Sequence, residues 1–437
     1  MASPRPSSIS LALLALLLSG DAGAIWGDSY EDFGLDGSLR TITLGTYNYA
    51  NDDIFGPENP GDGMSQTMLR LTIGGRPTDW LTYEIHGVQS LSFSTMVDAD
   101  LQGAAVFGTQ GVDTRYLVLN AAWDWADEND IQARLWLDRC NFKIVLPFAD
   151  VTVGRQAITF GKAYFWNPLD VFLAFDPRQF DRDYKAGVDA LRIDIPLGDF
   201  SGVNLVGVLG RKLSVYGSYR DEGAFNASWY GSAIVARAYT NLLEWDLAVQ
   251  GGKVYGGYQV GGAASGEIGE IAIRLEAAYL FAVDSDELPF PLSGKEVEDN
   301  FTGVIGLGHR FENTLHIEME YLYNGAGDPD KLEAALVRML AGGSYHMGEH
   351  LLGVVATYEI LPILNGSLAW IFSISDLSSL IQPGLALSVS DEAEFLFGAM
   401  IGLGARPVPS GIAGFPQLES EFGTYPNIYY MEFKFYF

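Results

Sequence analysis

The sequence predicts an all-β protein, a transmembrane antiparallel β-barrel of about 16 to 18 strands. Three observations carry this prediction: residues 431–437 alternate apolar with polar side chains, a leader-like apolar run lies near the start, and no later stretch reads as a helical membrane span although 48% of the chain is hydrophobic. A membrane protein without spanning helices has to be a closed barrel, because only a closed sheet pairs every backbone N–H and C=O in lipid.

The first residues have the pattern of a secretory signal peptide. Arg5 precedes the apolar run Ile9 to Leu18, and the small residues Ala22-Gly23-Ala24 follow. The run has about half of the roughly 20 residues that a spanning helix needs. We therefore expect a signal peptide over residues 1–24 and a single barrel domain over residues 25–437. The lone Cys140 fits an exported protein that does not rely on disulfides.

Segments with a period of two recur along the chain and separate an apolar face from a polar face. Charges between the apolar faces of a soluble sandwich would be costly, whereas a watery lumen accepts them. The lumen-facing candidates are Arg134, Asp138, Arg274, Glu276, His316, Glu318 and Glu320. Aromatic residues near segment ends are expected to form interfacial girdles. These are Tyr47, Tyr49, Trp80, Trp123, Trp125, Trp245, Tyr429 and Tyr430.

The last predicted strand runs from Met431 to Phe437. We expect Met431, Phe433, Phe435 and Phe437 to face lipid, and Glu432, Lys434 and Tyr436 to face the lumen. This ending resembles the assembly signal of Gram-negative barrel proteins, an aromatic-rich strand that ends in phenylalanine. The resemblance implies that Phe433, Phe435 and Phe437 form the signal and that the barrel-assembly machinery recognises it.

One stretch, at about residues 155–185, breaks the alternation and predicts a long charged loop. Loops of this length in compact proteins are usually functional. The loop carries the cations Arg155, Lys162, Arg178, Arg182 and Lys185 and the acids Asp170, Asp176, Asp181 and Asp183. Two interpretations stay open. The loop folds into the barrel, where opposed charges narrow the pore, or the charges pair with one another and pin an outer or periplasmic loop.

The G-R-Q, W-N-P-L-D and K-A-G-V-D-A elements of this stretch resemble those of large outer-membrane channels of the porin and alginate-export type. The resemblance implies a passive channel. Arg155, Arg178, Arg182 and Lys185 would then be constriction cations, with Asp170, Asp176, Asp181 and Asp183 as their counter-charges.

Other chemistry finds less support. The net charge of −29 makes the chain a poor nucleic-acid binder. His346-Met347-Gly348-Glu349-His350 matches the pattern of inverted zinc peptidases, which requires a helix. The helix predicted over Asp330 to Leu340 ends at Gly342-Gly343, before that motif. No metal and no cofactor are therefore expected.

The leading hypothesis is a porin-like channel, not an enzyme, in the outer membrane of a Gram-negative bacterium, through which small polar solutes or ions diffuse passively. An alternative is a barrel that sheaths a periplasmic multihaem cytochrome for electron transfer across the outer membrane. A third is an outer-membrane hydrolase that depends on His346 or His316. Expected partners are outer-membrane lipid, lipopolysaccharide and the assembly machinery. A homo-oligomer and a periplasmic cytochrome stay open as partners.

Overall fold

The computed structural model describes residues 26–27, 32–47, 61–95, 116–119, 121–128, 130–172, 184–211, 227–283, 298–340, 344, 346–412 and 415–437. The predicted signal peptide, residues 1–24, lies outside these ranges. No helix in them is long and apolar enough to cross a membrane.

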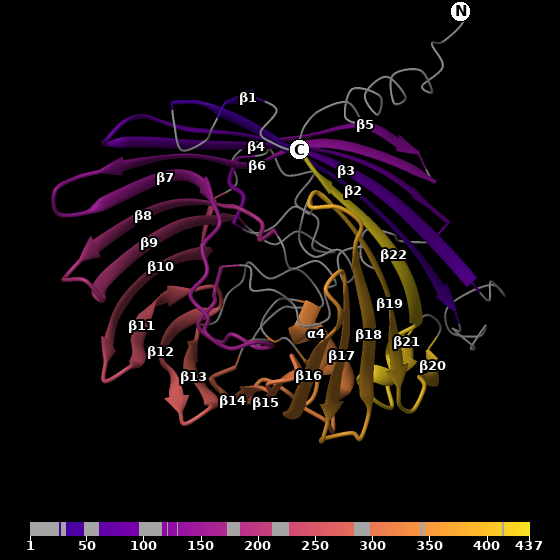
Figure 1. Ribbon diagram of the computed structural model, residues 1–437. Coiled ribbons are helices and arrows are strands. Elements are labelled where there is room, and N and C mark those ends of the chain that lie inside the picture. Colours follow the sequence, from indigo (N-terminus) through magenta and orange to yellow (C-terminus); the bar gives the residue numbers. More distant parts are fainter. Residues whose placement is uncertain are drawn as a thin grey trace, which may run out of the picture.

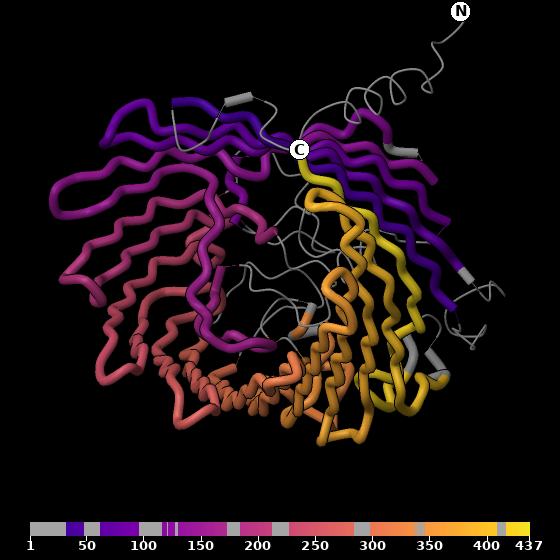
Figure 2. The backbone as a smooth tube through the Cα atoms, in the orientation of Figure 1, coloured from indigo at the N-terminus to yellow at the C-terminus, as the bar shows by residue number. Residues whose placement is uncertain are grey.

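Eighteen antiparallel strands close into a barrel, which confirms the predicted fold and the upper end of the predicted strand number (Figures 1 and 2). The strands are β2 (Gly34–Tyr47), β3 (Gly61–Thr78), β4 (Leu81–Ser94), β6 (Ile131–Val145), β7 (Asp150–Gln156), β8 (Val188–Pro196), β9 (Ser201–Arg211), β10 (Ala227–Leu242), β11 (Trp245–Val254), β12 (Gly257–Ile268), β13 (Ile271–Ala282), β14 (Asn300–Arg310), β15 (His316–Asn324), β16 (His350–Leu361), β17 (Leu364–Ser373), β18 (Ser379–Ser388), β19 (Ala393–Leu403) and β22 (Asn427–Tyr436). Each pairs with the next, and β22 pairs with β2.

Few other elements occur in the described ranges. The short strands β1 (Trp26–Gly27) and β5 (Ala122–Glu128) add to the edges of β2 and β6. Between β15 and β16 lies α4 (Leu332–Leu340), inside the helix predicted over Asp330 to Leu340. The connection from β19 to β22 holds a small sheet of β20 (Val408–Ile412) and β21 (Phe415–Gln417), followed by the 3-10 helix η2 (Phe422–Thr424).

The two ends of the barrel differ in their connections. Two-residue turns join β3 to β4, β10 to β11, β12 to β13 and β16 to β17 at one end. Most connections at the other end are longer, among them residues 157–187 between β7 and β8, which is the predicted loop. Short turns are periplasmic in bacterial barrels. The connection between β7 and β8 therefore begins at the outer end.

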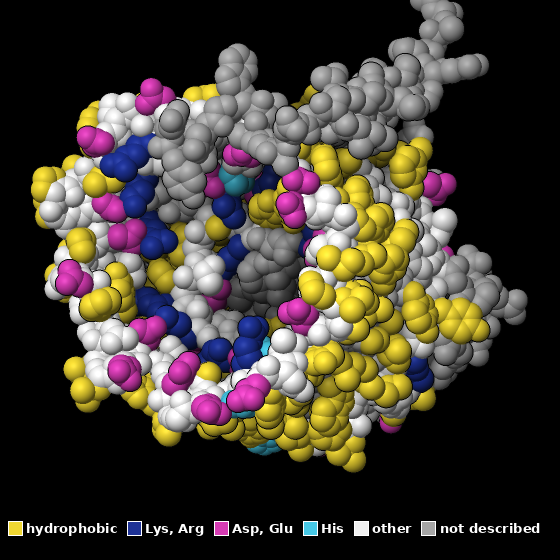
Figure 3. Space-filling model, viewed as in Figure 1, with side chains coloured by type: hydrophobic (Ala, Val, Ile, Leu, Met, Phe, Trp, Pro, Cys, Tyr) yellow, Lys and Arg dark blue, Asp and Glu magenta, His cyan; other side chains and the backbone are white. Residues whose placement is uncertain are grey.

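The outer face of the barrel is apolar and the inner face is polar. On β13, Leu275 and Phe281 are exposed, whereas Glu276 between them is buried. Apolar side chains cover the outside in Figure 3, and the end of the barrel is hollowed. The girdle prediction is wrong for Tyr430, which points inward and packs against the buried cluster around Phe165 and Trp166. Its neighbour Tyr429 is exposed.

The seam between β2 and β22 closes the barrel. Arg40 of β2 donates from Nε to Oε1 of Glu432 on β22 at 2.9 Å, and both side chains are buried. Gly37 and Phe437 exchange two backbone hydrogen bonds of 2.7 and 3.0 Å. The Phe437 ring lies where a Cβ on Gly37 would be, 2.3 Å from its Cε2. Gly37 thus leaves room for the ring that covers the seam.

We expect Phe437→Asp to lower the amount of folded barrel in the outer membrane. The substitution removes about 1–2 kcal/mol of apolar contact over Gly37 and places a charge on the lipid side of the seam. The heat-modifiable fraction of the outer-membrane protein measures the effect. Phe311→Asp is the control, because Phe311 is an exposed aromatic residue at the turn between β14 and β15. Normal levels of the Phe437 variant would contradict the expectation.

Candidate pore constriction

Residues 157–172, called the inner segment below, leave the end of β7 and lie against the inner wall (Figure 2). Phe160 packs against inward residues of β8, β9 and β10. Phe165 and Trp166 then reach inward residues of β14 to β19. Leu169 turns back to β12 and β13, and Phe172 rejoins the first cluster. The inner segment therefore makes an excursion along the wall from β8 to at least β16 and returns.

Glu276 of β13 fixes the base of this excursion. Its Oε2 accepts a hydrogen bond from the backbone N–H of Lys162 at 2.9 Å, and its Oε1 accepts one from Leu169 at 2.6 Å. One carboxylate thus joins the outgoing and the returning chain. Buried backbone N–H groups require acceptors, and the two oxygens of a carboxylate supply them. The local backbone is held to the wall although it forms no strand.

Glu320 of β15 fixes the tip of the excursion. Its two carboxylate oxygens accept hydrogen bonds from the backbone N–H groups of Tyr164, Phe165 (2.7 Å) and Trp166 (3.4 Å). The Glu320 side chain is fully buried. Side chains of the wall also bind carbonyl oxygens of the segment: Arg237 binds Phe160, Gln250 binds Leu169 and Gln259 binds Pro168.

Glu276, Glu318 and Glu320 were predicted to line the lumen as pore charges. All three lie on the inner face, but they are only 2%, 1% and 0% exposed. Glu276 and Glu320 hold the inner segment. Glu318 forms an ion pair with Arg274, and its Oε1 lies 3.0 Å from Nε2 of His316. Alternation along a strand gives the face of a residue but not what covers it, so the sequence could not reveal these anchoring roles.

The predicted constriction cations that the structure describes are all engaged by nearby groups. Arg155 is buried on β7, where its Nε is 2.8 Å from Oδ1 of Asp189 and its Nη atoms donate to the carbonyl oxygens of Leu137 and Leu119. Lys162 is half-exposed, and its Nζ lies 3.2 Å from Oδ2 of Asp246 on β11. Arg155 of β7 thus links its own strand to β6 and β8.

Lys185 and Asp170 form a buried pair within the connection from β7 to β8. Lys185 Nζ lies 2.5 Å from Oδ2 of Asp170, and both side chains are almost fully buried. Burial raises the pKa of the Asp170 carboxyl, and the nearby ammonium opposes that shift. Burial likewise lowers the pKa of Lys185. The pair ties the returning end of the connection to the end of the inner segment.

The remaining members of the predicted constriction set lie outside the described residues. They are Asp176, Arg178, Asp181, Arg182 and Asp183.

Two more lumen-facing candidates form ion pairs on β6. Arg134 Nε lies 2.7 Å from Oδ1 of Asp124 on β5, and Asp138 accepts a hydrogen bond from Arg70 at 2.5 Å. The register with β4 shifts beside Asp138, after which Arg139 also turns inward and binds Glu84 at 3.1 Å. Lys and Arg side chains gather along the inner edge of the wall formed by β7 to β12 (Figure 3).

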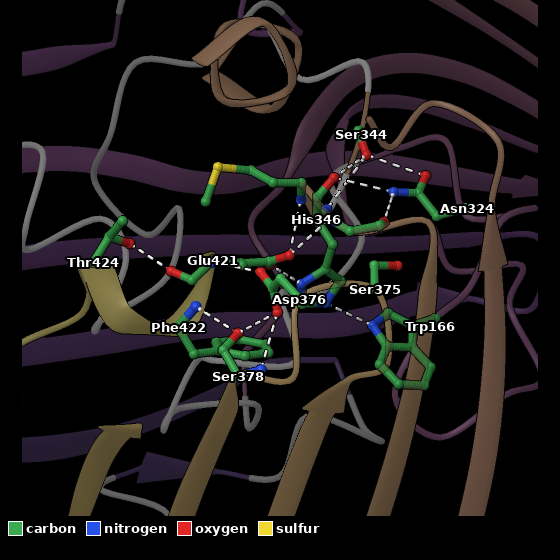
Figure 4. Close-up of polar contacts among 12 residues, drawn as sticks. Trp166, Asn324, Ser344, His346, Ser375, Asp376, Ser378, Glu421, Phe422 and Thr424 are labelled. Carbon is green, nitrogen blue, oxygen red and sulfur yellow. Dashed lines mark hydrogen bonds and ion pairs between the residues drawn. The ribbon is translucent and has the colours of Figure 1, made fainter. Parts of the chain in front are cut away.

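His346, from the motif singled out in the sequence, lies between β15 and β16 and joins this connection to two others (Figure 4). Its Nδ1 lies 2.5 Å from Oε1 of Glu421, and its Nε2 lies 2.9 Å from the indole Nε1 of Trp166. The other Glu421 oxygen accepts the N–H groups of Met347 (3.0 Å) and Gly348 (2.8 Å). Residues 346–349 are not helical and lead into β16. The helix that a zinc peptidase needs to bring the two histidines of this motif together is therefore not formed.

Three comparisons with known proteins show what this chain is similar to. No protein-family model matches the chain, and no curated protein matches its sequence. Solved structures match its fold. OccK9 (OpdG) of Pseudomonas aeruginosa has a TM-score of 0.55 and 8% identity, over 93% of this chain and 98% of that chain. A BenF-like porin from Pseudomonas fluorescens has a TM-score of 0.53 and 11% identity, over 94% of this chain and 100% of that chain. OccAB4 of Acinetobacter baumannii has a TM-score of 0.53 and 9% identity, over 93% of this chain and 98% of that chain.

The chain has the porin fold. The predicted resemblance to outer-membrane channels of the porin type is confirmed at the level of the fold. At 8 to 11% identity the likeness concerns the fold of the porin barrel and not its solute.

Proposed function

We propose that the protein is an outer-membrane channel for passive diffusion of small polar solutes or ions, and that the inner segment sets the width of its pore. The observation that carries the proposal is the seating of this segment. Five of its backbone N–H groups are bound by Glu276 and Glu320, so a defined stretch of chain is held inside the barrel. A fixed constriction with charged walls is how a wide barrel becomes a selective pore.

The charge pattern of the inner wall supports a path for polar solutes. Arg139 and Arg192 lie on the inner face with their partners Glu84 and Asp194, and neither pair is fully buried. Charges in a narrow space are poorly screened and concentrate the field. Arg178 and Arg182 remain predicted constriction cations on the strength of the sequence. No enzymatic activity is proposed.

The alternative, a sheath for a periplasmic cytochrome, requires a lumen that is free for a second protein. The inward apolar residues of β14 to β19 are instead covered by the chain's own Phe165, Trp166 and Phe422. This arrangement favours the channel.

Planar-bilayer recording from the purified, refolded protein tests the proposal. We expect discrete conductance steps in the absence of any other protein. An absence of steps from correctly folded, heat-modifiable protein would overturn it. Co-purification of a haem protein from outer membranes, together with no conductance of the isolated barrel, would favour the sheath.

A further inference from the structure

We propose that His346 is a proton-operated latch on the inner segment: the neutral imidazole accepts the indole N–H of Trp166, and protonation of the ring releases it. This inference rests on the proposed function, because it names how the same constriction is regulated.

The partners of the ring fix its tautomer. An indole N–H can only donate, so Nε2 of His346 has to accept the hydrogen bond from Trp166 at 2.9 Å. Nδ1 therefore carries the hydrogen and donates to Oε1 of Glu421 at 2.5 Å. Both His346 and Glu421 are fully buried. The observed arrangement is thus one in which the imidazole is neutral.

A second proton cannot be added without loss of a contact. In the imidazolium form both ring nitrogens carry hydrogen, so the Nε2–H would point at the indole N–H. Two donors facing each other at this separation repel. The hydrogen bond from Nδ1–H to Glu421 remains, and its donor is now a charged ring. Protonation therefore moves Trp166 away while it leaves His346 on Glu421.

Trp166 is a suitable element for such a release. It is 1% exposed and lies at the tip of the inner segment, where Glu320 holds its backbone N–H at the longest of the three distances, 3.4 Å. Its ring packs edge-on against His346 and beside Phe165. Release of Trp166 thus loosens the tip of the inner segment.

Glu421 is itself held firmly, so the imidazole is the movable partner. Its backbone N–H donates to Oδ2 of Asp376 at 2.6 Å, and Asp376 also binds Ser378 (Figure 4). Phe422 donates its N–H to Ser378 Oγ. The connections from β17 to β18 and from β19 to β22 thereby form a rigid seat for the histidine.

The other charged groups around the latch are few among the described residues. Asp376 and Arg406 lie on the neighbouring connections, and Arg406 binds the carbonyl oxygens of Gly423 and Tyr425. Glu320 lies below the tip on β15. At the start of β16, His350 binds the Tyr321 hydroxyl at 2.7 Å and lies 3.9 Å from Glu349. His350 is half-exposed and therefore offers a matched control histidine.

Single-channel recording of the full-length protein between about pH 8 and about pH 5 tests the latch. We expect acid to raise about tenfold the ratio of the time that the channel spends in the wide state to the time in the narrow state. A tenfold change corresponds to the loss of about one buried hydrogen bond. Trp166→Phe should abolish the step and stay wide, because the hydrogen bond that the latch releases is already absent. His346→Phe should abolish the step and stay wide. His350→Phe should keep the step.

A pH step that persists in Trp166→Phe or His346→Phe, or that disappears in His350→Phe, would overturn the latch. A channel that conducts at neither pH would overturn the proposed function instead. The indole N–H resonance of Trp166 in detergent micelles, identified by its loss in Trp166→Phe, gives a readout without conductance. We expect it to shift with acid in the wild type and to stay constant in His346→Phe, and a resonance that does not move in the wild type would overturn the latch.

Discussion

Replacing Glu276 and Glu320 together with alanine is expected to raise the single-channel conductance at least about twofold. Hydrogen bonds to charged groups contribute about 1.5–3 kcal/mol each, so the loss of several exceeds about 5 kcal/mol. The apolar burial of Phe165 and Trp166 contributes about 2–3 kcal/mol for each side chain, so the lost hydrogen bonds are comparable to the apolar contacts that hold the tip of the inner segment. Each single substitution should give a smaller increase than the pair.

Glu318→Gln is the matched control for this experiment. Glu318 lies on the same strand and the same face as Glu320 but is bound to Arg274 and His316 rather than to the inner segment. The control should leave the width of the pore unchanged. An unchanged conductance in a folded double variant would mean that the segment is held by other groups or does not limit the flow.

Removing one charge of the seam pair should strongly impair the folded barrel. Glu432→Leu takes the carboxylate away from the guanidinium of Arg40, which is 4% exposed. Breaking a buried pair in this way costs about 3–5 kcal/mol, whereas replacing both partners with apolar residues is often nearly neutral. We therefore expect a lower unfolding temperature and less heat-modifiable barrel for Glu432→Leu, with part of the loss recovered by Arg40→Met in the same chain, because the buried Lys434, whose Nζ lies 3.9 Å from Oε2 of Glu432, keeps its charge. A double variant as unstable as the single one would contradict this account.

The sequence predicted the barrel because alternation is a local property of each strand. Period two along β13 and β15 placed Leu275 and Met319 outside and Glu276 and Glu320 inside, and the structure agrees. The break in alternation likewise located the connection from β7 to β8. These features depend on neighbours in the chain, which is why single-sequence reasoning reached them.

The roles of the inner residues could not be predicted because their partners are distant in the chain. Glu320 binds residues that are 154 to 156 positions away, and the seam joins Arg40 to Glu432 across 392 positions. His346 drew attention through a zinc-like spacing, yet Trp166 and Glu421, which use its two ring nitrogens, are 180 and 75 positions away. No spacing in the sequence encodes such contacts.

The central claim is that a water-filled pore runs through the barrel and that the inner segment sets its narrowest width. Exclusion of graded polyethylene glycols from the open channel measures that width directly. The wild type is compared with a variant in which residues 162–169, the stretch between the two Glu276 contacts, are replaced by a short Gly-Ser linker. The account predicts that the variant admits larger polymers and conducts more than the wild type. An identical polymer cut-off in both proteins, or no conductance in either, would contradict it.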